Sequence, residues 1–209
     1  MSTKSEQLFE TFLSCNSLRF VKVKEDSTPL PDYLVLIAGL QIIFELKELA
    51  EDENFDVVKD PTHPRIKSHS RTLGDQVRRR IEGSRKQLQY GADQGIPSVL
   101  LIYNSLDRVF QSFGTEPMDF VAAMYGAPTV LLNRESMRIS EMFNRKGQMM
   151  QVKKNTSFSA VGHLCDRAGK TTVVLFENVF AKLKLPYDRL PPCFEMRRIE
   201  ISREPLTLP

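Results

Sequence analysis

The segment from Tyr33 to Phe44 most constrains the fold of this chain. Pro31 stands just before it, and proline suits the first position of a strand because it cannot donate to the ladder. Ala38-Gly39 offers a turn in the middle, and the residues on both sides are rich in the β-branched and aromatic types that favour strands. The pattern therefore predicts a β-hairpin whose second strand runs through Lys47.

A helical interpretation of the second half of this segment stays open, because the period of a short apolar run is ambiguous. Apolar residues at helical spacing would then lie opposite a solvated face of Glu45, Lys47 and Glu48; they are Ile42, Ile43, Leu46, Leu49 and Ala50. The sequence is acidic from Glu48 to Glu53, and its helical tendency increases there. We therefore expect the strand to lead into a loop or short helix after Lys47.

Two carboxylates and an amine flank the predicted hairpin, in Pro31-Asp32 and Glu45-Leu46-Lys47. Because side chains alternate along a strand, Glu45 and Lys47 would emerge on one face and Leu46 on the other. One or two carboxylates and a substrate phosphate can hold Mg²⁺, and an ammonium can orient water and offset developing charge. The pattern predicts metal-dependent phosphodiester cleavage, with Asp32 and Glu45 as metal ligands and Lys47 as the catalytic amine.

The order Pro-Asp, then acidic residue, any residue and Lys, resembles the PD-(D/E)XK (restriction-endonuclease-like) nuclease superfamily. Each fragment occurs once in this chain. The resemblance implies an α/β fold with an αβββαβ core, in which helices flank a mixed central sheet. It also implies an Mg²⁺-dependent endonuclease acting on DNA, with Mn²⁺ as a substitute metal.

The first half of the chain has the pattern of such a core. An apolar stripe of Leu8, Phe9, Phe12 and Leu13 predicts a first helix, and Leu18–Lys24 alternates like a strand. After the hairpin, Thr72–Tyr90 is helical by period, and Ser98–Tyr103 has the continuous apolar character of a buried strand. The order is helix, three strands, helix, strand.

The resemblance adds two candidates to the site. Such families often place a Glu on the first helix, and Glu10 is the better match for this accessory acid and metal ligand, with Glu6 as the runner-up. They also often place a Gln, Lys or Arg on the helix after the acidic-x-Lys strand, which makes Gln87 a candidate catalytic residue. The alternatives are that these are ordinary solvated helix residues.

Charge is segregated along the chain. The whole chain carries +3, whereas residues 45–60 carry −5 and residues 63–90 carry +6. Basic residues surround the apolar stripe of the predicted helix Thr72–Tyr90, and such residues bind phosphates in a salt-dependent way. The predicted nucleic-acid contacts are Arg78, Arg79, Arg80, Arg85 and Lys86. A solvated basic face without a ligand is the alternative.

The length and the 41% hydrophobic composition suit a single domain, 1–209, with its core at about 5–135. A β-rich extension at about 150–205 is expected to form a small added sheet that supports dimerisation or shapes a DNA cleft. It would hold a hairpin, Ser157–Leu164 with Thr171–Glu177, and a strand Phe194–Ile201. Before it we expect a short helix, Phe120–Tyr125, a strand, Thr129–Leu132, and an exposed polar segment, Ser136–Phe143.

Other classes of site lack their signatures. The three cysteines and three histidines have no metal-ligand spacing, and the chain has no complete P-loop and no Gly-x-Ser-x-Gly elbow. The apolar stretches are too short to span a bilayer, and the N-terminus lacks a signal-peptide pattern. We expect a cytoplasmic protein without membrane contact that binds DNA and forms a possible homodimer, with RNA left open. The alternative function is a catalytically silent nuclease-fold module for nucleic-acid binding or assembly.

Overall fold

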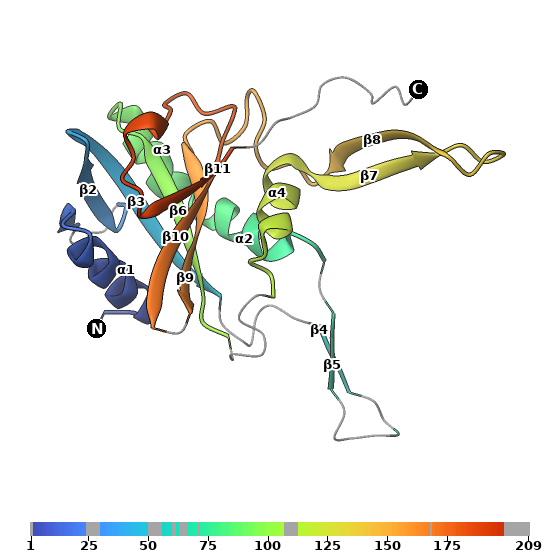
Figure 1. The fold of residues 1–209 in the computed structure, drawn as a ribbon, viewed down its shortest axis with the longest axis horizontal. Coiled ribbons are helices and arrows are strands. Elements are labelled where there is room, and N and C mark those ends of the chain that lie inside the picture. Colours follow the sequence, from blue (N-terminus) through green and yellow to red (C-terminus); the bar gives the residue numbers. More distant parts are fainter. Residues whose placement is uncertain are drawn as a thin grey trace.

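A mixed seven-stranded β-sheet forms the centre of the molecule in the computed structural model (Figure 1). Its strands are β1 (Arg19–Lys22), β2 (Tyr33–Ile37), β3 (Leu40–Leu49), β6 (Ser98–Asn104), β9 (Ala160–Arg167), β10 (Lys170–Glu177) and β11 (Phe194–Arg197), side by side in that order. The structure describes residues 2–23, 30–49, 56–59, 62, 67–70, 72–106, 113–167 and 169–198. Of residues 56–59, 67–70, 140–143, 145 and 146 it describes the backbone only.

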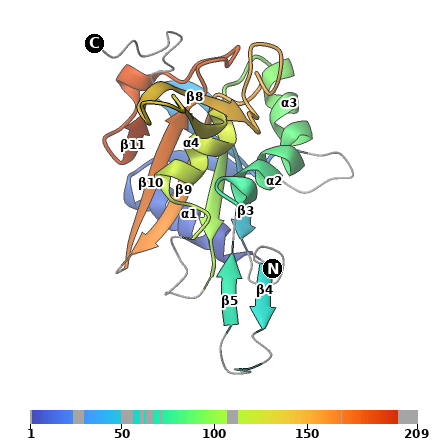
Figure 2. The same ribbon diagram turned by 90° about the vertical axis from the view of Figure 1, so that its right-hand side faces the viewer.

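Helices cover both faces of this sheet, which confirms the expected α/β class. The α-helices of the described part are α1 (Lys4–Cys15), α2 (Asp75–Gly83), α3 (Arg85–Asp93) and α4 (Pro117–Tyr125), and a short 3₁₀ helix spans Tyr187–Arg189. Two hairpins form small sheets of their own: β4 (Asp56–Lys59) with β5 (Lys67–Ser70), and β7 (Ala127–Leu132) with β8 (Ile139–Lys146). Both hairpins project from the body in Figure 1, and Figure 2 shows β4 and β5 extending below it.

The first half of the chain contains the expected helix, three strands, helix and strand, but the hairpin β4–β5, which the sequence did not predict, lies between β3 and α2. β1, β2 and β3 are antiparallel neighbours, and β6 pairs with β3 in parallel. Parallel strands need a long crossover connection, which α2 and α3 supply here. Every residue of β6 is buried, as its continuous apolar sequence predicted.

The predicted helix Thr72–Tyr90 is two helices, because the chain bends at Gly83-Ser84. A Gly/Ser pair is a common place for a helix to kink. The predicted apolar face is nevertheless correct: Val77, Ile81, Ser84 and Leu88 are all fully buried.

Two expectations about the segment after Phe44 are wrong. The helical interpretation of residues 42–50 fails, because residues 40–49 form a single strand paired to both β2 and β6. The strand also continues past Lys47 to Leu49, which pairs with Asn104 of β6 and is fully buried. Residues 50–55 and His63 lie outside the described residues, while His69 lies on β5.

The C-terminal strands do not form the small added sheet that we expected. β9 pairs in parallel with β6, so β9, β10 and β11 complete the central sheet. Gly162 allows this packing, because a Cβ there would lie 2.7 Å from side chains of both Leu101 and Leu175. The expected polar segment Ser136–Phe143 is also partly a strand, since β8 begins at Ile139.

Two apolar clusters hold the helices on the sheet. On one face, Phe9, Phe12 and Leu13 of α1 pack against a cluster that includes Tyr33 and Phe44. On the other face, side chains of α2, α3 and α4 pack against alternate residues of β3 and β6. Among the helices that the structure describes, none has the length and apolar character needed to cross a membrane.

Candidate active site

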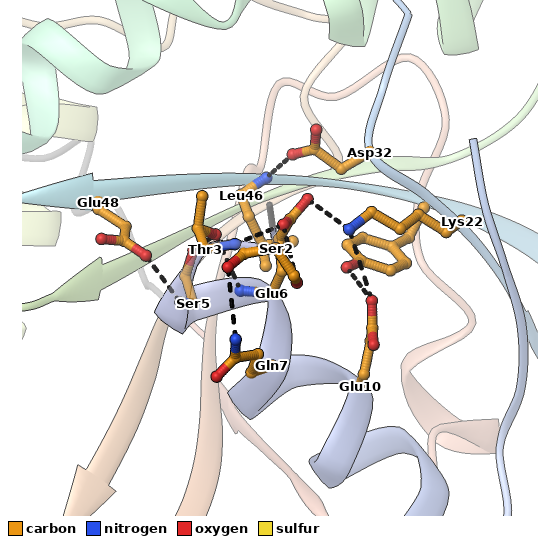
Figure 3. Close-up of polar contacts among 11 residues, drawn as sticks. Ser2, Thr3, Ser5, Glu6, Gln7, Glu10, Lys22, Asp32, Leu46 and Glu48 are labelled. Atoms are coloured by element: carbon orange, nitrogen blue, oxygen red, sulfur yellow. Dashed lines mark hydrogen bonds and ion pairs between the residues drawn. The ribbon is translucent and has the colours of Figure 1, made fainter. Parts of the chain in front are cut away.

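The β2–β3 hairpin brings Asp32, Glu45 and Lys47 together. Tyr33 is paired with Phe44, so Asp32 stands beside Glu45 just before β2 begins. The Asp32 carboxylate accepts a hydrogen bond of 2.7 Å from the Leu46 backbone N–H (Figure 3). This bond extends the contact between the two strands to the residue before Tyr33, the first residue of β2, next to Pro31, which has no N–H to donate. The hairpin register therefore sets the position of Asp32.

Alternation along β3 separates the polar side chains from the α1 face. Phe44 and Leu46 join the apolar cluster under α1, and Glu45 and Lys47 alternate with them. Lys47 Nζ lies 2.7 Å from Glu45 Oε1. Such a short ion pair between neighbours on one face of a strand holds both head groups in one place.

Glu45 is buried, with only 1% of its surface exposed. Burial and the neighbouring charge of Asp32, partly offset by Lys47, raise the pKa of the Glu45 carboxyl to about 7. Its second oxygen, Oε2, is buried without a hydrogen-bond partner. A buried carboxylate oxygen without a partner is costly, so this site is electrostatically unsatisfied and would gain from a nearby cation.

The Asp32 carboxyl shares this environment. Burial raises its pKa, and the charge of Glu6 raises it further, against the opposing effects of the Leu46 N–H and Lys47. Because the Asp32 charge in turn raises the pKa of Glu45, the two carboxyl groups form a pair that a divalent cation would stabilise.

The acids of α1 are held by other groups. Glu10 Oε1 accepts a hydrogen bond of 2.7 Å from the Tyr33 hydroxyl, and Lys22 Nζ lies 3.7 Å away. Glu6 pairs with Lys22 at 2.9 Å and also accepts a hydrogen bond from the Thr3 backbone N–H, as part of the capping box of α1 (Figure 3). Of the two candidates, Glu6 is the one whose charge acts on the Asp32 carboxyl.

Three residues that support this arrangement were missed in the sequence. Lys22 lies between Glu6 and Glu10, Tyr33 ties Glu10 to β2, and Glu48 accepts a hydrogen bond of 2.7 Å from the Ser5 backbone N–H (Figure 3). Glu48 lies on the α1 side of β3, two residues from Leu46. Alternation along a longer strand was the signal that could have placed Glu48 on this side.

The predicted phosphate-binding residues of α2 and α3 fall into different environments. Arg78 donates hydrogen bonds to the backbone oxygens of Gly147 and Ala122, and Arg79 pairs with Asp75 at 2.8 Å. Arg80 and Arg85 are half-buried, and Lys86 is exposed. Arg78 and Arg79 therefore have partners within the protein, and Arg79 and Lys86 are the exposed residues of the five.

Gln87 lies on α3, the helix that packs over β3 and β6. Its Oε1 atom is buried without a hydrogen-bond partner, as is Nε of Arg85 on the same helix. Gly91, one turn further along, faces Ile43 and Ser98 at the start of these two strands. Because α3 runs opposite to β3, Gln87 lies nearer than Gly91 to the level of Glu45.

No group of three or more His, Cys, Asp or Glu side chains placed to hold a metal ion occurs among the described residues. His163 is buried, and burial together with the charge of Arg167 lowers its pKa to about 4. Comparisons with protein-family models, with curated proteins and with solved structures found no match to this chain.

Proposed function

We propose that this protein is an Mg²⁺-dependent endonuclease of the PD-(D/E)XK type that hydrolyses phosphodiester bonds in DNA. The observation that carries the proposal is the buried Glu45 carboxylate, with one oxygen 2.7 Å from Lys47 Nζ and the other without a partner, beside the Asp32 carboxylate. The order of α1, β1 to β3, α2, α3 and β6 supports the assignment, because it has the elements of an αβββαβ core.

Asp32 and Glu45 are the residues that would hold the metal. Mg²⁺ prefers carboxylate oxygens and needs only one or two of them beside the substrate phosphate. The unpartnered Glu45 Oε2 fits this requirement, since a cation would satisfy it. When bound, Mg²⁺ would supply Lewis-acid stabilisation of the scissile phosphate.

Lys47 has the amine role in this proposal. Its side chain is one-third exposed while its partner Glu45 is buried, so the ammonium lies at the boundary between the site and solvent. From there it can donate to an attacking water and to a phosphoryl oxygen that gains charge in the transition state. Glu10 remains the proposed accessory acid, with Glu6 as the alternative because of its effect on Asp32.

The proposed substrate path runs from this site toward α3, with Lys86 and Arg85 as phosphate contacts and Gln87 as a catalytic candidate. Arg80 would add to the positive potential of this path. Arg78 and Arg79 would add to it as well, although Arg78 binds the Gly147 backbone oxygen and Arg79 pairs with Asp75. DNA is the proposed substrate, and RNA remains an alternative substrate.

The test is Mg²⁺-dependent cleavage of linear, circular and branched DNA by the wild type and two variants. Asp32→Asn keeps an acceptor for the Leu46 N–H but lacks the charge, and Lys47→Ala removes the amine. Each is expected to lose about 10²-fold or more in rate. Lys182→Ala, at an exposed position in the loop after β10, is the matched control and should cleave like the wild type.

Undiminished Mg²⁺-dependent cleavage by either site variant, with circular dichroism showing intact folding, would overturn the proposal. DNA binding that persists in EDTA without any Mg²⁺-dependent cutting would instead support the catalytically silent binding or assembly module.

A further inference from the structure

The hairpin of β7 and β8, residues 127–146, forms an arm that stands clear of the central sheet. Among the described strands the two pair with each other in a sheet of their own, and Figure 1 shows the ribbon leaving the body next to α4. An isolated two-stranded ribbon is marginally stable in water. The arm therefore depends on a fixed base for a defined direction.

The base of the arm is fixed to α2 and α4. Met149 and Met150, just after β8, donate backbone hydrogen bonds of 3.0 and 2.8 Å to the backbone oxygens of Ala123 and Met124. Arg78 of α2 donates to Gly147 at 3.0 Å and to Ala122 at 3.2 Å. These bonds at both ends of the hairpin hold the arm in a defined direction.

The tip of the arm is also ordered. Asn133 Oδ1 accepts hydrogen bonds from the backbone N–H groups of Glu135 and Ser136, at 3.0 and 2.9 Å. The Asn133 N–H donates to Arg138 O at 2.8 Å, which closes the loop. Met137 has a left-handed backbone, with φ of 54°, and its side chain is 71% exposed. A preorganised loop that presents an apolar side chain loses little entropy on binding.

The exposed surface of the arm combines apolar and basic groups. Val130, Leu132 and Ile139 are each more than 40% exposed. Arg134 and Arg138 are exposed at the tip, and neither has an ion-pair partner among the described residues. By sequence, residues 127–146 hold four basic and two acidic residues, a net +2 of the +3 carried by the whole chain. Exposed apolar patches mark binding surfaces, and the net charge favours a polyanion.

We propose that this arm lies in the major groove of duplex DNA, with Arg134 and Arg138 on phosphates and Met137 against the bases. The inference rests on the proposed function, for which it identifies duplex DNA as the substrate. The major groove admits a two-stranded β-ribbon, and its thymine methyl groups give apolar side chains a partner. Arginine–phosphate pairs at the tip would set the depth and direction of the arm.

The experiment is the equilibrium binding of a fluorescent duplex in EDTA, so that cleavage plays no part. Arg134→Ala/Arg138→Ala is compared with Lys153→Ala/Lys182→Ala, which removes two exposed charges outside the arm. We expect the arm variant to bind roughly tenfold to a hundredfold more weakly near 0.1 M salt. The slope of the logarithm of the binding constant against the logarithm of the salt concentration should become less steep by about 2, because each lost phosphate contact removes roughly 0.9. The control should bind like the wild type.

Groove competition completes the test. Methyl green, a major-groove ligand, should displace the wild type, whereas netropsin, a minor-groove ligand, should not. Met137→Ser should weaken duplex binding and leave single-strand binding unchanged.

Three outcomes would overturn the arm proposal: no duplex binding by the wild type, equal affinity and salt slope in the arm variant, or displacement by netropsin alone. A change from dimer to monomer in sedimentation on replacing arm residues, with duplex affinity unchanged, would also overturn it, because the occupant would then be a second copy of this chain. Arm-dependent duplex binding by a wild type that shows no Mg²⁺-dependent cleavage would reject only the nuclease activity.

Discussion

Lys47 Nζ lies 2.7 Å from Glu45 Oε1, and this ion pair joins a lysine side chain that is one-third exposed to a buried carboxylate on one face of β3. The pair is local, since only Leu46 separates its members. Its environment is not local, because the burial of Glu45 requires the helices and strands that pack around β3.

Replacing Lys47 with Met should destabilise the protein when Glu45 is charged. Without the ammonium, Glu45 would face the Asp32 charge in a buried site with no compensation. We expect the free energy of unfolding in EDTA to fall by about 1–3 kcal/mol at pH 8 and by less at pH 5, measured by urea denaturation. Arg79→Met, which breaks the exposed pair with Asp75, is the control and should cost under about 1 kcal/mol. An equal cost at both pH values would contradict the role of Glu45.

Glu45 should make the metal-free protein less stable as the pH rises. Its folded pKa of about 7 exceeds the ordinary value of 4.5, so the folded state retains the proton that the unfolded state releases. The contribution of Glu45 to stability is present below pH 4.5 and is lost between pH 4.5 and about 7. Glu45→Gln should remove this part of the pH dependence in thermal unfolding curves recorded in EDTA.

Mg²⁺ should stabilise the folded protein through the charge of the Glu45 carboxylate. At pH 8, adding Mg²⁺ should raise the melting temperature of the wild type, because a ligand that binds only the folded state stabilises it. The increase should be smaller in Glu45→Gln. An equal increase in both proteins would show that the cation binds elsewhere.

His163 should produce a pH dependence of the opposite sign. Its folded pKa of about 4 lies below the ordinary value of 6.5, so the unfolded state binds the proton first as the pH falls. Its contribution to stability is therefore present above pH 6.5 and is lost toward pH 4, by up to about 3 kcal/mol. Because the Glu45 range overlaps, His163→Leu is best measured in the Glu45→Gln background, where the slope over this range should flatten. A slope that persists would contradict the burial of a neutral imidazole.

Gly162→Ala should destabilise the sheet. The added Cβ would meet Leu101 and Leu175 at 2.7 Å and the Val174 backbone oxygen at 2.8 Å. Overpacking of this kind costs about 1–3 kcal/mol or more, measurable as a lower urea midpoint. Gly83→Ala is the matched control, because its Cβ would meet nothing within 4 Å, and it should be neutral or stabilising by up to about 1 kcal/mol. Similar losses for both variants would contradict the close packing at Gly162.

Much of the candidate site could be predicted from the sequence because it depends on short-range geometry. A two-residue turn at Ala38-Gly39 sets the register of β2 and β3, and the register sets Asp32 beside Glu45. The period of two along β3 then puts Glu45 and Lys47 on the same side. The acids of α1 could not be ranked in this way. Glu6 and Glu10 are one turn apart on the same helix face, and only the packing of α1 determines that Glu10 binds Tyr33 while the charge of Glu6 acts on Asp32.

By itself, the sequence determined the α/β class, the order of the elements in the first half apart from the hairpin β4–β5, and the apolar faces of its helices, because turns, strands and helix faces follow from local residue patterns. Only the tertiary structure decided that β9, β10 and β11 complete the central sheet, that Arg78 fixes the base of an arm, and that β3 runs on to Leu49. The physical reason is that the period of apolar residues within a segment shows which face of a helix or strand is buried. Which element buries them, and which donors meet which acceptors, depends on contacts between residues far apart in the chain.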